Sequence, residues 1–447
     1  MLFALKSLVP QPFVRAYHYV LARLAQLAYG NPSKDLIVIG VTGTNGKTTT
    51  AYFIAKALEA SGHQTGCTTT AVMKVGKKEW LNKTKMTMPG RFFLQKTLRD
   101  MVRADCRYAV VETSSQGLMQ SRHVGIEYDV AVFTNLTPEH IEAHGGFENY
   151  KRAKRRLFER VAARHPKKID GQDVPKIAVL NADSEQAEFY ADVPGFDRVS
   201  WYGIRSDREF RAENLDLRAD GSGFTVLGSR INLKLPGEYN ISNALAALAV
   251  CRALGVDLRA AAKRLSAIER VPGRFDRVDE GQPWTVIVDY AYEPESFARF
   301  YDALALLEKK HVIHVLGSCG GGRDVARRPI LGRMAAERAD VVIVTNEDPY
   351  DDDPQMIIDQ VAEGAVTGGK RDGQDLFRIL DRREAIHKAM AMAKTGDLVV
   401  LTGKGCEPWI CLSNGRKLPW DEAAVAREAI RNQLAAGLRP PLPTSGI

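Results

Sequence analysis

Ile37-Val-Ile-Gly-Val-Thr-Gly-Thr-Asn-Gly-Lys-Thr-Thr-Thr50 is the stretch of sequence that decides the fold. A β-branched apolar run leads through spaced glycines to a lysine and three threonines, and a helical pattern follows over residues 51–60. A strand, a glycine-rich turn and a helix bind phosphate well, because backbone N–H groups converge on the anion and the helix dipole favours negative charge. The stretch therefore predicts an α/β domain that binds the phosphates of a nucleotide.

This stretch departs from the strict phosphate-loop pattern, because Val41 stands where that pattern has its first glycine. The glycines present are Gly40, Gly43 and Gly46. An ordinary glycine-rich turn is the alternative, but Gly-Lys-Thr-Thr after a buried strand favours binding of ATP or GTP. Lys47 would then reach the β- and γ-phosphates, and the Thr48 hydroxyl would bind Mg²⁺.

The composition is typical of a soluble globular enzyme of two or three domains, with 447 residues, 45% of them apolar and 26% charged. The formal charge of +8 suits anionic substrates. Because the basic residues are spread out and no recognition motif appears, we expect no nucleic-acid partner. The six cysteines form no CxxC pair, and no secretory signal is visible, so reduced thiols in the cytoplasm are expected.

The N-terminal segment contains one weakly amphipathic stretch, residues 17–29. It is too short, and too interrupted by Arg23, to span a bilayer. Packing against the following domain is predicted for one helical face, formed by Leu21, Leu24, Ala25 and Ala28. Interfacial contact with a membrane is the weaker alternative. Pro10 and Pro12 interrupt any apolar core of a cleavable signal.

Strand and helix patterns alternate from residue 36 to residue 270, with apolar strand candidates at 108–112, 130–135 and 176–181. This alternation predicts a parallel sheet with helices on both faces. Residues 196–235 carry shorter alternating stretches, which predict an antiparallel addition. The predicted fold class is therefore α/β, with a central phosphate-loop ATPase domain.

A second alternating series begins after a break near residue 271, with strand candidates at 284–289, 311–317, 341–345 and 398–402. It predicts a second doubly wound, Rossmann-like domain. The expected organisation is a short helical segment over 1–35, the central ATP-binding domain over 36–270, the C-terminal domain over 271–436 and a loose tail over 437–447.

Two polar clusters follow strand ends of the first series, where ligands sit in open parallel sheets. Glu112 ends an apolar run and could hold Mg²⁺ directly or through water. The alternative is an incidental acid before a helix capped by Ser114 or Ser115. His140 and His144 are four residues apart and share a helical face, so a metal pair and a structural pair are equally plausible from the pattern.

Lys154 falls inside the apolar stripe of a helix predicted over residues 148–162, whereas the neighbouring arginines lie on its solvated side. A lone lysine on a buried face should be paired or should have lost its charge. Covalent conversion to an anion would also resolve the cost. Snorkelling of the stem to the helix edge is an equally good interpretation of the pattern.

Two further groups of polar residues could contact a nucleotide. Asn240 and Asn243 begin a helix and could read a base edge, although a plain helix cap is the simpler interpretation. Arg274, in Gly273-Arg-Phe-Asp276, offers a cation at the domain junction that suits a phosphate. A surface ion pair with Asp276 or a neighbouring residue is an equally good alternative.

Together these motifs resemble the Mur ligase family, and within it the MurE type that adds the third residue of the peptidoglycan stem peptide. The resemblance covers residues 36–430 and keeps the family's order of motifs. It rests on Gly43-Thr-Asn-Gly-Lys-Thr-Thr49, Glu112-Thr-Ser-Ser115, Asn135-Leu-Thr-Pro-Glu-His140, Glu148-Asn-Tyr150 with Lys154 and Phe158, Asn240 with Asn243, Gly273-Arg274 and Asp289-Tyr-Ala-Tyr-Glu-Pro294.

The resemblance implies roles for particular residues. Catalysis would involve Lys47, Glu112, His140, Lys154 and Arg274. ATP would contact Gly43, Thr44, Asn45, Gly46, Lys47, Thr48, Thr49, Asn240, Asn243, Arg274 and Asp289. Two Mg²⁺ ions would be held by Thr48, Glu112, His140 and a carbamylated Lys154. The acceptor and the amino acid would contact Thr87, Met88, Pro89, Ser114, Ser115, Gln120, Arg122, Asn346, Asp348, Gly403 and Glu407.

Several positions depart from the family pattern. The family's N-terminal domain, which holds the uridine diphosphate of the substrate, is expected to be missing, because residues 1–35 alone precede the loop. Tyr292 and Cys406 stand where the family has histidines. Tyr350 stands where MurE-type ligases carry the arginine that pairs with the distal carboxylate of diaminopimelate, and it cannot form that ion pair.

The predicted function is an ATP-dependent amide-bond ligase. ATP would phosphorylate a carboxylate of a muramoyl-peptide acceptor, and the amine of an amino acid would displace phosphate from the acyl phosphate. A cytoplasmic monomer is expected. The alternatives are a ligase similar to folylpolyglutamate synthase and a non-catalytic nucleotide-binding partner of cell-wall synthesis.

Overall fold

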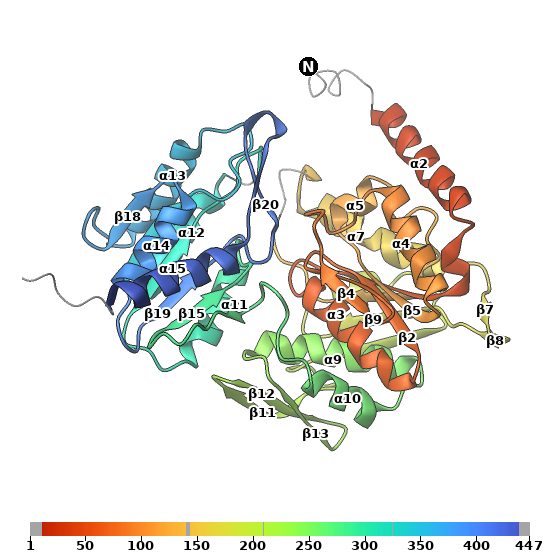
Figure 1. Cartoon of the computed structure of the whole chain (residues 1–447). Helices are drawn as coiled ribbons and strands as arrows, with labels where there is room; N and C mark the ends of the chain where they lie inside the picture. The colour runs from red at the N-terminus through yellow and green to blue at the C-terminus, as the bar shows by residue number, and fades with distance from the viewer. Residues whose placement is uncertain (1–10, 140–143, 209, 324, 438–447) are drawn as a thin grey trace, which may run out of the picture. The chain divides into compact units, whose positions relative to one another are not determined.

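The computed structural model describes residues 11–139, 144–208, 210–323 and 325–437. The chain divides into two compact units, Met1–Glu269 (the N-terminal unit) and Arg270–Ile447 (the C-terminal unit). Both are α/β units built on a mainly parallel sheet (Figure 1), as the alternating patterns predict. Within the described ranges, no helix is both long enough and apolar enough to cross a membrane.

The N-terminal unit contains an eight-stranded sheet in which only β3 runs antiparallel to the other strands. Its order across the sheet is β10 (Arg198–Tyr202), β9 (Ile177–Asn181), β6 (Val130–Phe133), β1 (Ile37–Thr42), β5 (Cys106–Glu112), β2 (Gln64–Thr68), β3 (Val72–Val75) and β4 (Lys78–Leu81). Strand β1 lies between β5 and β6, and all its residues are buried. The phosphate-binding stretch therefore begins at the centre of the sheet.

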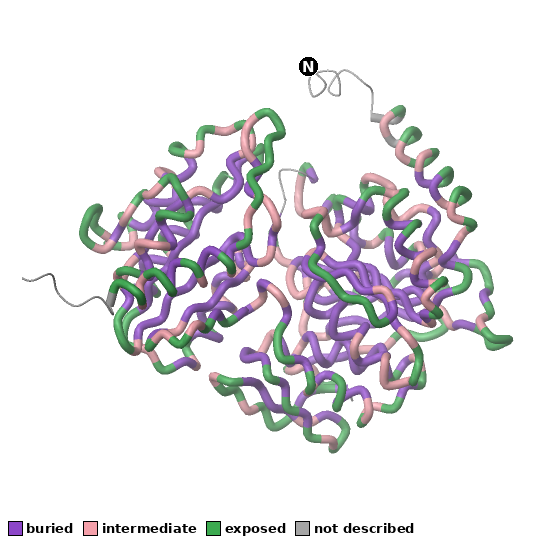
Figure 2. Tube along the Cα trace, in the orientation of Figure 1, coloured by how far each residue is buried: buried purple, intermediate pink, exposed green. Residues whose placement is uncertain are grey.

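Helices cover both faces of this sheet (Figure 1). One face carries α3 (Lys47–Leu58), α9 (Glu238–Ala253) and α10 (Leu258–Ser266). The other carries α4 (Arg91–Arg103), the short α5 (Ser115–Met119) and α7 (Phe147–Ala162), while α8 (Ala187–Ala191) follows β9. Figure 2 shows the strands buried between these layers.

Residues 196–235 do not form one antiparallel addition. Strand β10 instead belongs to the main sheet, where it pairs in parallel with β9. The antiparallel part is a separate three-stranded sheet formed by β11 (Glu213–Arg218), β12 (Gly221–Val226) and β13 (Ser229–Leu233). A two-stranded hairpin, β7 (Lys168–Ile169) and β8 (Gln172–Asp173), lies between α7 and β9 in the chain.

The N-terminal segment forms helix α2 (Gln11–Ala28) and the short 3-10 helix η1 (Pro32–Asp35). It packs on α4, so the predicted packing against the following domain is confirmed. The predicted face is correct in part: Ala25 is completely buried and Leu21 is half-buried, but Leu24 is 50% exposed and Ala28 is exposed, and Ala22 is buried in their place. The docked face is therefore centred on small residues.

The C-terminal unit contains a six-stranded sheet in which only β14 runs antiparallel. Its order is β14 (Asp276–Arg277), β15 (Thr285–Val288), β19 (Leu398–Leu401), β16 (Val312–Leu316), β17 (Val341–Thr345) and β18 (Leu376–Ile379). Four of these, β15, β16, β17 and β19, lie within the strand ranges predicted from sequence. The doubly wound prediction is confirmed.

The helices of the C-terminal unit also lie on both faces of its sheet. They are α11 (Pro294–Ala305), α12 (Arg327–Arg338) and α13 (Pro354–Thr367) on one face, and α14 (Arg382–Met392) and α15 (Glu422–Gly437) on the other. A hairpin of β20 (Trp409–Cys411) and β21 (Lys417–Pro419) follows β19. Helix α15 ends at Gly437, and the rest of the predicted tail lies outside the described residues.

Candidate active site

The phosphate-binding loop connects β1 to α3 and requires its glycines. Gly43 has a φ of +151°, and a Cβ atom there would lie 1.9 Å from Oγ1 of Thr134. Gly46 caps α3 with a φ of +78°, and a Cβ atom there would lie 2.5 Å from Oδ1 of Asn243. Helix α3 begins at Lys47, earlier than the helical pattern suggests, so its N-terminus faces the loop.

The loop is held by contacts to the neighbouring strand β6. The Asn45 N–H donates to Oδ1 of Asn135 at 2.9 Å, and Thr134 Oγ1 donates to the Asn45 carbonyl at 2.7 Å. Lys47 is half-buried, and its Nζ donates to the Thr44 carbonyl at 2.6 Å. Its ammonium therefore lies against the loop, where an anion bound at the N-terminus of α3 would meet it.

Glu112 ends the neighbouring strand β5 and is 1% exposed. Its carboxylate accepts hydrogen bonds from Thr48 Oγ1 at 3.0 Å, the Thr70 N–H at 2.6 Å and Thr70 Oγ1 at 3.0 Å. The carboxyl ends of β1 and β5 meet at the same edge of the sheet, which brings Thr48 to Glu112. The predicted pair is thus together in the structure.

Lys154 lies on α7 and is 1% exposed. Its Nζ donates to the carbonyl of Gly43 at 2.7 Å and lies 4.2 Å from the centre of the Tyr150 ring. Burial, followed by the charge of Lys47, lowers the pKa of Lys154 well below its ordinary value. The side chain points at the phosphate loop and does not snorkel to the helix edge.

A buried polar network surrounds Lys154. The Thr44 and Tyr150 hydroxyls are 3.1 Å apart, and the Tyr150 hydroxyl donates to Glu139 at 3.3 Å. His144 Nε2 lies 3.1 Å from the Ser115 hydroxyl. His140, the other member of the predicted histidine pair, lies outside the described residues.

Asn240 and Asn243 are buried inside α9, whose N-cap is Gly237, so the helix-cap interpretation is wrong for both. Asn243 Oδ1 accepts from the Thr50 hydroxyl of α3 at 3.0 Å, and its amide donates to Asn240 Oδ1 at 3.3 Å. The two asparagines therefore connect α9 to the helix that begins at the phosphate loop.

The predicted acceptor-contacting residues gather around the loop after β4 and helix α5. Arg122 donates to the Met88 carbonyl and, at 2.6 Å, to Oε1 of Gln120. Thr87 accepts at 2.9 Å from the hydroxyl of Thr70, which also bonds to Glu112. Pro89, which follows Met88, and Ser115, the first residue of α5, are both buried. Ser114 is the N-cap of α5, so the capping interpretation holds for this residue.

Arg274 and Asp289 lie at one edge of the C-terminal sheet. The Arg274 guanidinium lies 4.3 Å from the centre of the Tyr290 ring. Asp276 forms an ion pair with Arg270, at 3.6 Å. Asp289 accepts from two backbone N–H groups, each at 2.6 Å, and burial raises its pKa. It therefore shapes the turn that presents Tyr290.

The predicted amino-acid-contacting residues surround Lys404, which is completely buried. Lys404 Nζ contacts Asp348 at 3.1 Å and Glu407 at 2.7 Å, and it donates to the Trp409 carbonyl at 2.7 Å. Gly403 has a φ of +96°, and a Cβ atom there would lie 2.2 Å from Oε2 of Glu347. The remaining predicted residue, Asn346, contributes its carbonyl to Arg382 at 3.2 Å.

The structure also describes the three residues at which the sequence departs from the family pattern, Tyr292, Tyr350 and Cys406. Tyr350 has a φ of +53°, and its hydroxyl accepts from Arg323 at 3.3 Å. Tyr292 packs edge-on against Tyr290, with ring centres 5.1 Å apart. Burial raises the pKa of the Cys406 thiol to about 11, which supports a filler rather than a reactive thiol.

Comparison with known proteins now identifies the chain. The Mur ligase middle domain model matches residues 41–251, and the model of the Mur ligase glutamate ligase domain matches residues 273–405. The chain belongs to the Mur ligase family. It is 41% identical over 439 residues to a UDP-N-acetylmuramyl-tripeptide synthetase of Roseiflexus sp. (strain RS-1), covering 94% of the chain and 84% of that protein.

A second relative of this Mur ligase is a UDP-N-acetylmuramoyl-L-alanyl-D-glutamate–2,6-diaminopimelate ligase of Geobacillus kaustophilus (strain HTA426), 38% identical over 95% of the chain and 85% of that protein. A solved structure of a ligase of that name is 28% identical, with a TM-score of 0.60 over 94% of the chain and 83% of its own. Mycobacterium tuberculosis folylpolyglutamate synthase shares the fold alone, at 19% identity and a TM-score of 0.66, over 95% of the chain and 96% of its own.

Mur ligases are ATP-dependent amide ligases that use Mg²⁺, and the residues at the phosphate loop fit both. Glu112 and Thr48 are oxygen ligands at the edge of the sheet, as Mg²⁺ prefers. The described residues contain no group of three or more His, Cys, Asp or Glu side chains that could hold a metal ion. Glu112 and Thr48 would supply one or two protein ligands to Mg²⁺, and phosphate and water would supply the rest.

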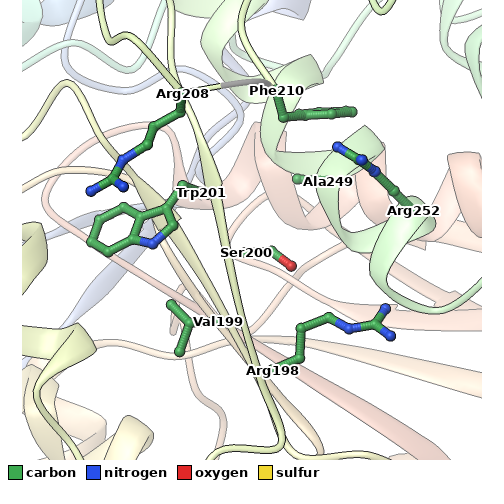
Figure 3. A pocket seen from close by; sticks show the side chains of 8 residues that line it. All are labelled: Arg198, Val199, Ser200, Trp201, Arg208, Phe210, Ala249 and Arg252. Atoms are coloured by element: carbon green, nitrogen blue, oxygen red, sulfur yellow. The ribbon is translucent and has the colours of Figure 1, made fainter.

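A separate groove of about 430 Å³ lies away from these residues, at the outer edge of the N-terminal sheet (Figure 3). It is lined by β10 and α9 and carries three arginines and two aromatic residues, Arg198, Arg208, Arg252, Trp201 and Phe210. Arg208 stacks 4.6 Å from Trp201 and bonds to Glu188 at 3.3 Å, so part of its charge is already compensated. None of the predicted site residues lines this groove.

Sequence reasoning missed several residues of the Mur ligase site. Thr70, Glu139 and Tyr150 contact predicted residues, and so do Lys404 and Glu347. A run of three threonines after β2, residues 68–70, was the available signal for Thr70. Lys404 lies three residues before Glu407, but the sequence carries no sign of its other acidic partner, Asp348, which follows a different strand.

Proposed function

We propose that this Mur ligase adds an amino acid to a carboxylate of a UDP-N-acetylmuramoyl-dipeptide acceptor, with ATP as the energy source. The names of its relatives at 41% and 38% identity support this acceptor. The observation that carries the ligase assignment is the arrangement around the loop. Lys47, the Glu112–Thr48 pair and the buried amine of Lys154 all meet the segment between β1 and α3.

The reaction has two steps. An acceptor carboxylate oxygen attacks the γ-phosphorus of ATP, ADP leaves, and an acyl phosphate forms. The amine of the amino acid then attacks the acyl carbon, loses a proton and expels phosphate. Both steps are mainly positioning and charge neutralisation. We assign Lys47 and Arg274 to the charge on the transferred phosphoryl group.

We assign magnesium to two positions, one at Thr48 and Glu112 and one at His140 and a carbamylated Lys154. Bound magnesium supplies neutralisation of the phosphate charge. The support at Lys154 is its buried position beside the phosphate loop and its lowered pKa, since burial favours the neutral amine that reacts with CO₂. The carbamate so formed would be an anion that could hold magnesium, and this pairing would offset the cost of a charged group on the apolar stripe.

The adenosine end of ATP is assigned to the Asn240–Asn243 turn of α9 and to Asp289 with Arg274. Asn243 already contacts α3 through Thr50, which places it beside the phosphate-binding helix. The remaining loop residues, Gly43, Thr44, Asn45, Gly46 and Thr49, would surround the phosphates. The acceptor peptide is assigned to Thr87–Pro89 and Arg122, whose contacts lead back to Glu112 through Thr70.

The amino acid is assigned to the C-terminal unit, beside Asp348, Gly403 and Glu407. Glu347 supports this assignment, because its Oε2 is buried and meets no hydrogen-bond donor within the described residues. An uncompensated carboxylate oxygen matches the ammonium group of an amino acid. The buried Lys404 holds Asp348 and Glu407 in place on the other side.

We further propose a cytoplasmic monomer. All the assigned side chains come from one chain, ATP is a cytoplasmic substrate, and the six cysteines are free thiols, as expected in a reducing compartment.

The function is tested by phosphate release from ATP, with UDP-linked muramoyl dipeptide or a folate as acceptor and a panel of amino acids that includes diaminopimelate and lysine. We expect release only with the muramoyl acceptor. Lys47→Ala and Glu112→Ala should abolish it, whereas Lys56→Ala, a change of lysine on the same helix, should not. Release with folate alone, or unchanged turnover in both loop variants, contradicts the proposal.

A further inference from the structure

Helix α2, much of which is exposed (Figure 2), presents an apolar stripe to solvent. The stripe consists of Phe13, Tyr17, Val20, Leu24 and Leu27, which are 68%, 61%, 53%, 50% and 75% exposed. These residues follow each other at steps of four and three, so they lie along one side of the helix. Exposed apolar surface of this regularity marks an interaction site.

The orientation of the stripe is set by contacts on the other side of the helix. Ala22 and Ala25 are completely buried there, where α2 packs on α4 (Figure 1). At the C-terminal end, Arg99 of α4 donates to the carbonyls of Tyr29 and Gly30, at 2.8 Å in each case. The helix is therefore docked through its small residues, and the large apolar ones face outward.

The charge of this segment is of one sign. Residues 1–34 contain no Asp or Glu, and their cations are Lys6, Arg15, Arg23 and Lys34. The Arg23 guanidinium contacts the Tyr19 hydroxyl at 3.2 Å and Gln26 at 2.9 Å. A second copy of α2 would bring like charges together, whereas anionic lipid headgroups complement them.

We propose that α2 is an interfacial helix that binds the surface of an anionic membrane, with the apolar stripe inserted between the headgroups. Aromatic residues in the stripe suit the interface, because their rings lie at the boundary of headgroup and acyl chain. Phe92 and Phe93 of α4, 45% and 41% exposed, add apolar surface on the helix that carries α2. The proposal is independent of the substrate assigned above.

The test uses the full chain and flotation with vesicles of phosphatidylcholine alone or mixed with phosphatidylglycerol. We expect binding to the mixed vesicles to be at least about 10-fold stronger than to phosphatidylcholine, and to weaken in high salt. The double variant L24E/L27E should reduce binding at least about 10-fold. The matched control L215E/L217E changes two exposed leucines of β11 and should bind as the wild type does.

Solution size and ATP-driven phosphate release accompany the flotation. The L24E/L27E variant should stay folded and keep its activity in solution, because α2 contributes no assigned catalytic residue. Equal binding to both vesicle types, or equal binding by the two double variants, overturns the proposal. A wild-type dimer that L24E/L27E dissociates, without any vesicle binding, overturns it in favour of a second copy as the occupant.

Discussion

Lys154 and Lys404 are the most deeply buried lysines in the described parts of the N-terminal and C-terminal units of this Mur ligase, and they are buried in opposite ways. Lys404 is enclosed with two carboxylates, Asp348 and Glu407. Lys154 meets a carbonyl and an aromatic ring, and Lys47 adds to the unfavourable field around it. A buried ammonium enclosed by two carboxylates is a structural cation, whereas burial beside a second cation lowers the pKa of an amine and favours its neutral, reactive form.

The first test of this difference between the two lysines removes the amine of Lys154. Lys154→Met should lower phosphate release by at least about 10²-fold, because the carbamate that we assign to magnesium cannot form. Lys154→Arg should be equally inactive, since a guanidinium is not carbamylated. Lys151→Met, a change on the same helix outside the buried stripe, is the control. Full activity of either Lys154 variant would show that the amine has no catalytic role.

For Lys404, the structural lysine, we expect the main effect of substitution to be on stability. Lys404→Met leaves Asp348 and Glu407 buried without their cation and should destabilise the C-terminal unit by about 3–5 kcal/mol. Lys154→Met should cost far less, since it removes an unfavourable burial. Denaturant unfolding followed by hydrogen exchange in each unit separates the two effects. Similar losses for the two variants would mean that the lysines do not differ as proposed.

The stability of the N-terminal unit should depend on pH through Lys154. Its pKa is lowered in the folded state, so the unfolded state binds more protons, and stability rises with pH from the folded pKa up to about 10.4. The slope contributed by one group is at most about 1.4 kcal/mol per pH unit. In CO₂-free, magnesium-free buffer, the wild type should gain stability relative to Lys154→Met as pH rises. A difference that is flat with pH contradicts a lowered pKa.

The smallest effect is expected next to Lys404, at Cys406. Burial raises the pKa of its thiol to about 11, so little thiolate exists at neutral pH. Cys406→Ala should change phosphate release by less than about 2-fold, and alkylation of this thiol in the folded protein should be slow. Rapid alkylation that also stops turnover would assign the thiol a direct role.

Local patterns were enough to predict most of the fold. The strands β1, β5, β6 and β9 are short apolar runs bounded by glycine or polar residues, and such runs become buried parallel strands almost regardless of context. Lys154 was found because a charge inside an apolar helical stripe violates the pattern around it. The position of β10 was not predicted, because pairing with β9 is a choice between distant segments that no local pattern encodes.

By itself, the sequence determined which side chains stand at the carboxyl ends of strands, since strand ends follow from hydrophobic runs. Lys47, Glu112 and the Lys154 stripe belong to that part. Only the tertiary structure decided the distant partners of the buried polar side chains: Thr70 for Glu112, Gly43 for Lys154, and Asp348 for Lys404. Whether a buried lysine is a cation or a neutral amine depends on charges brought from other strands, and sheet order, not sequence spacing, brings them.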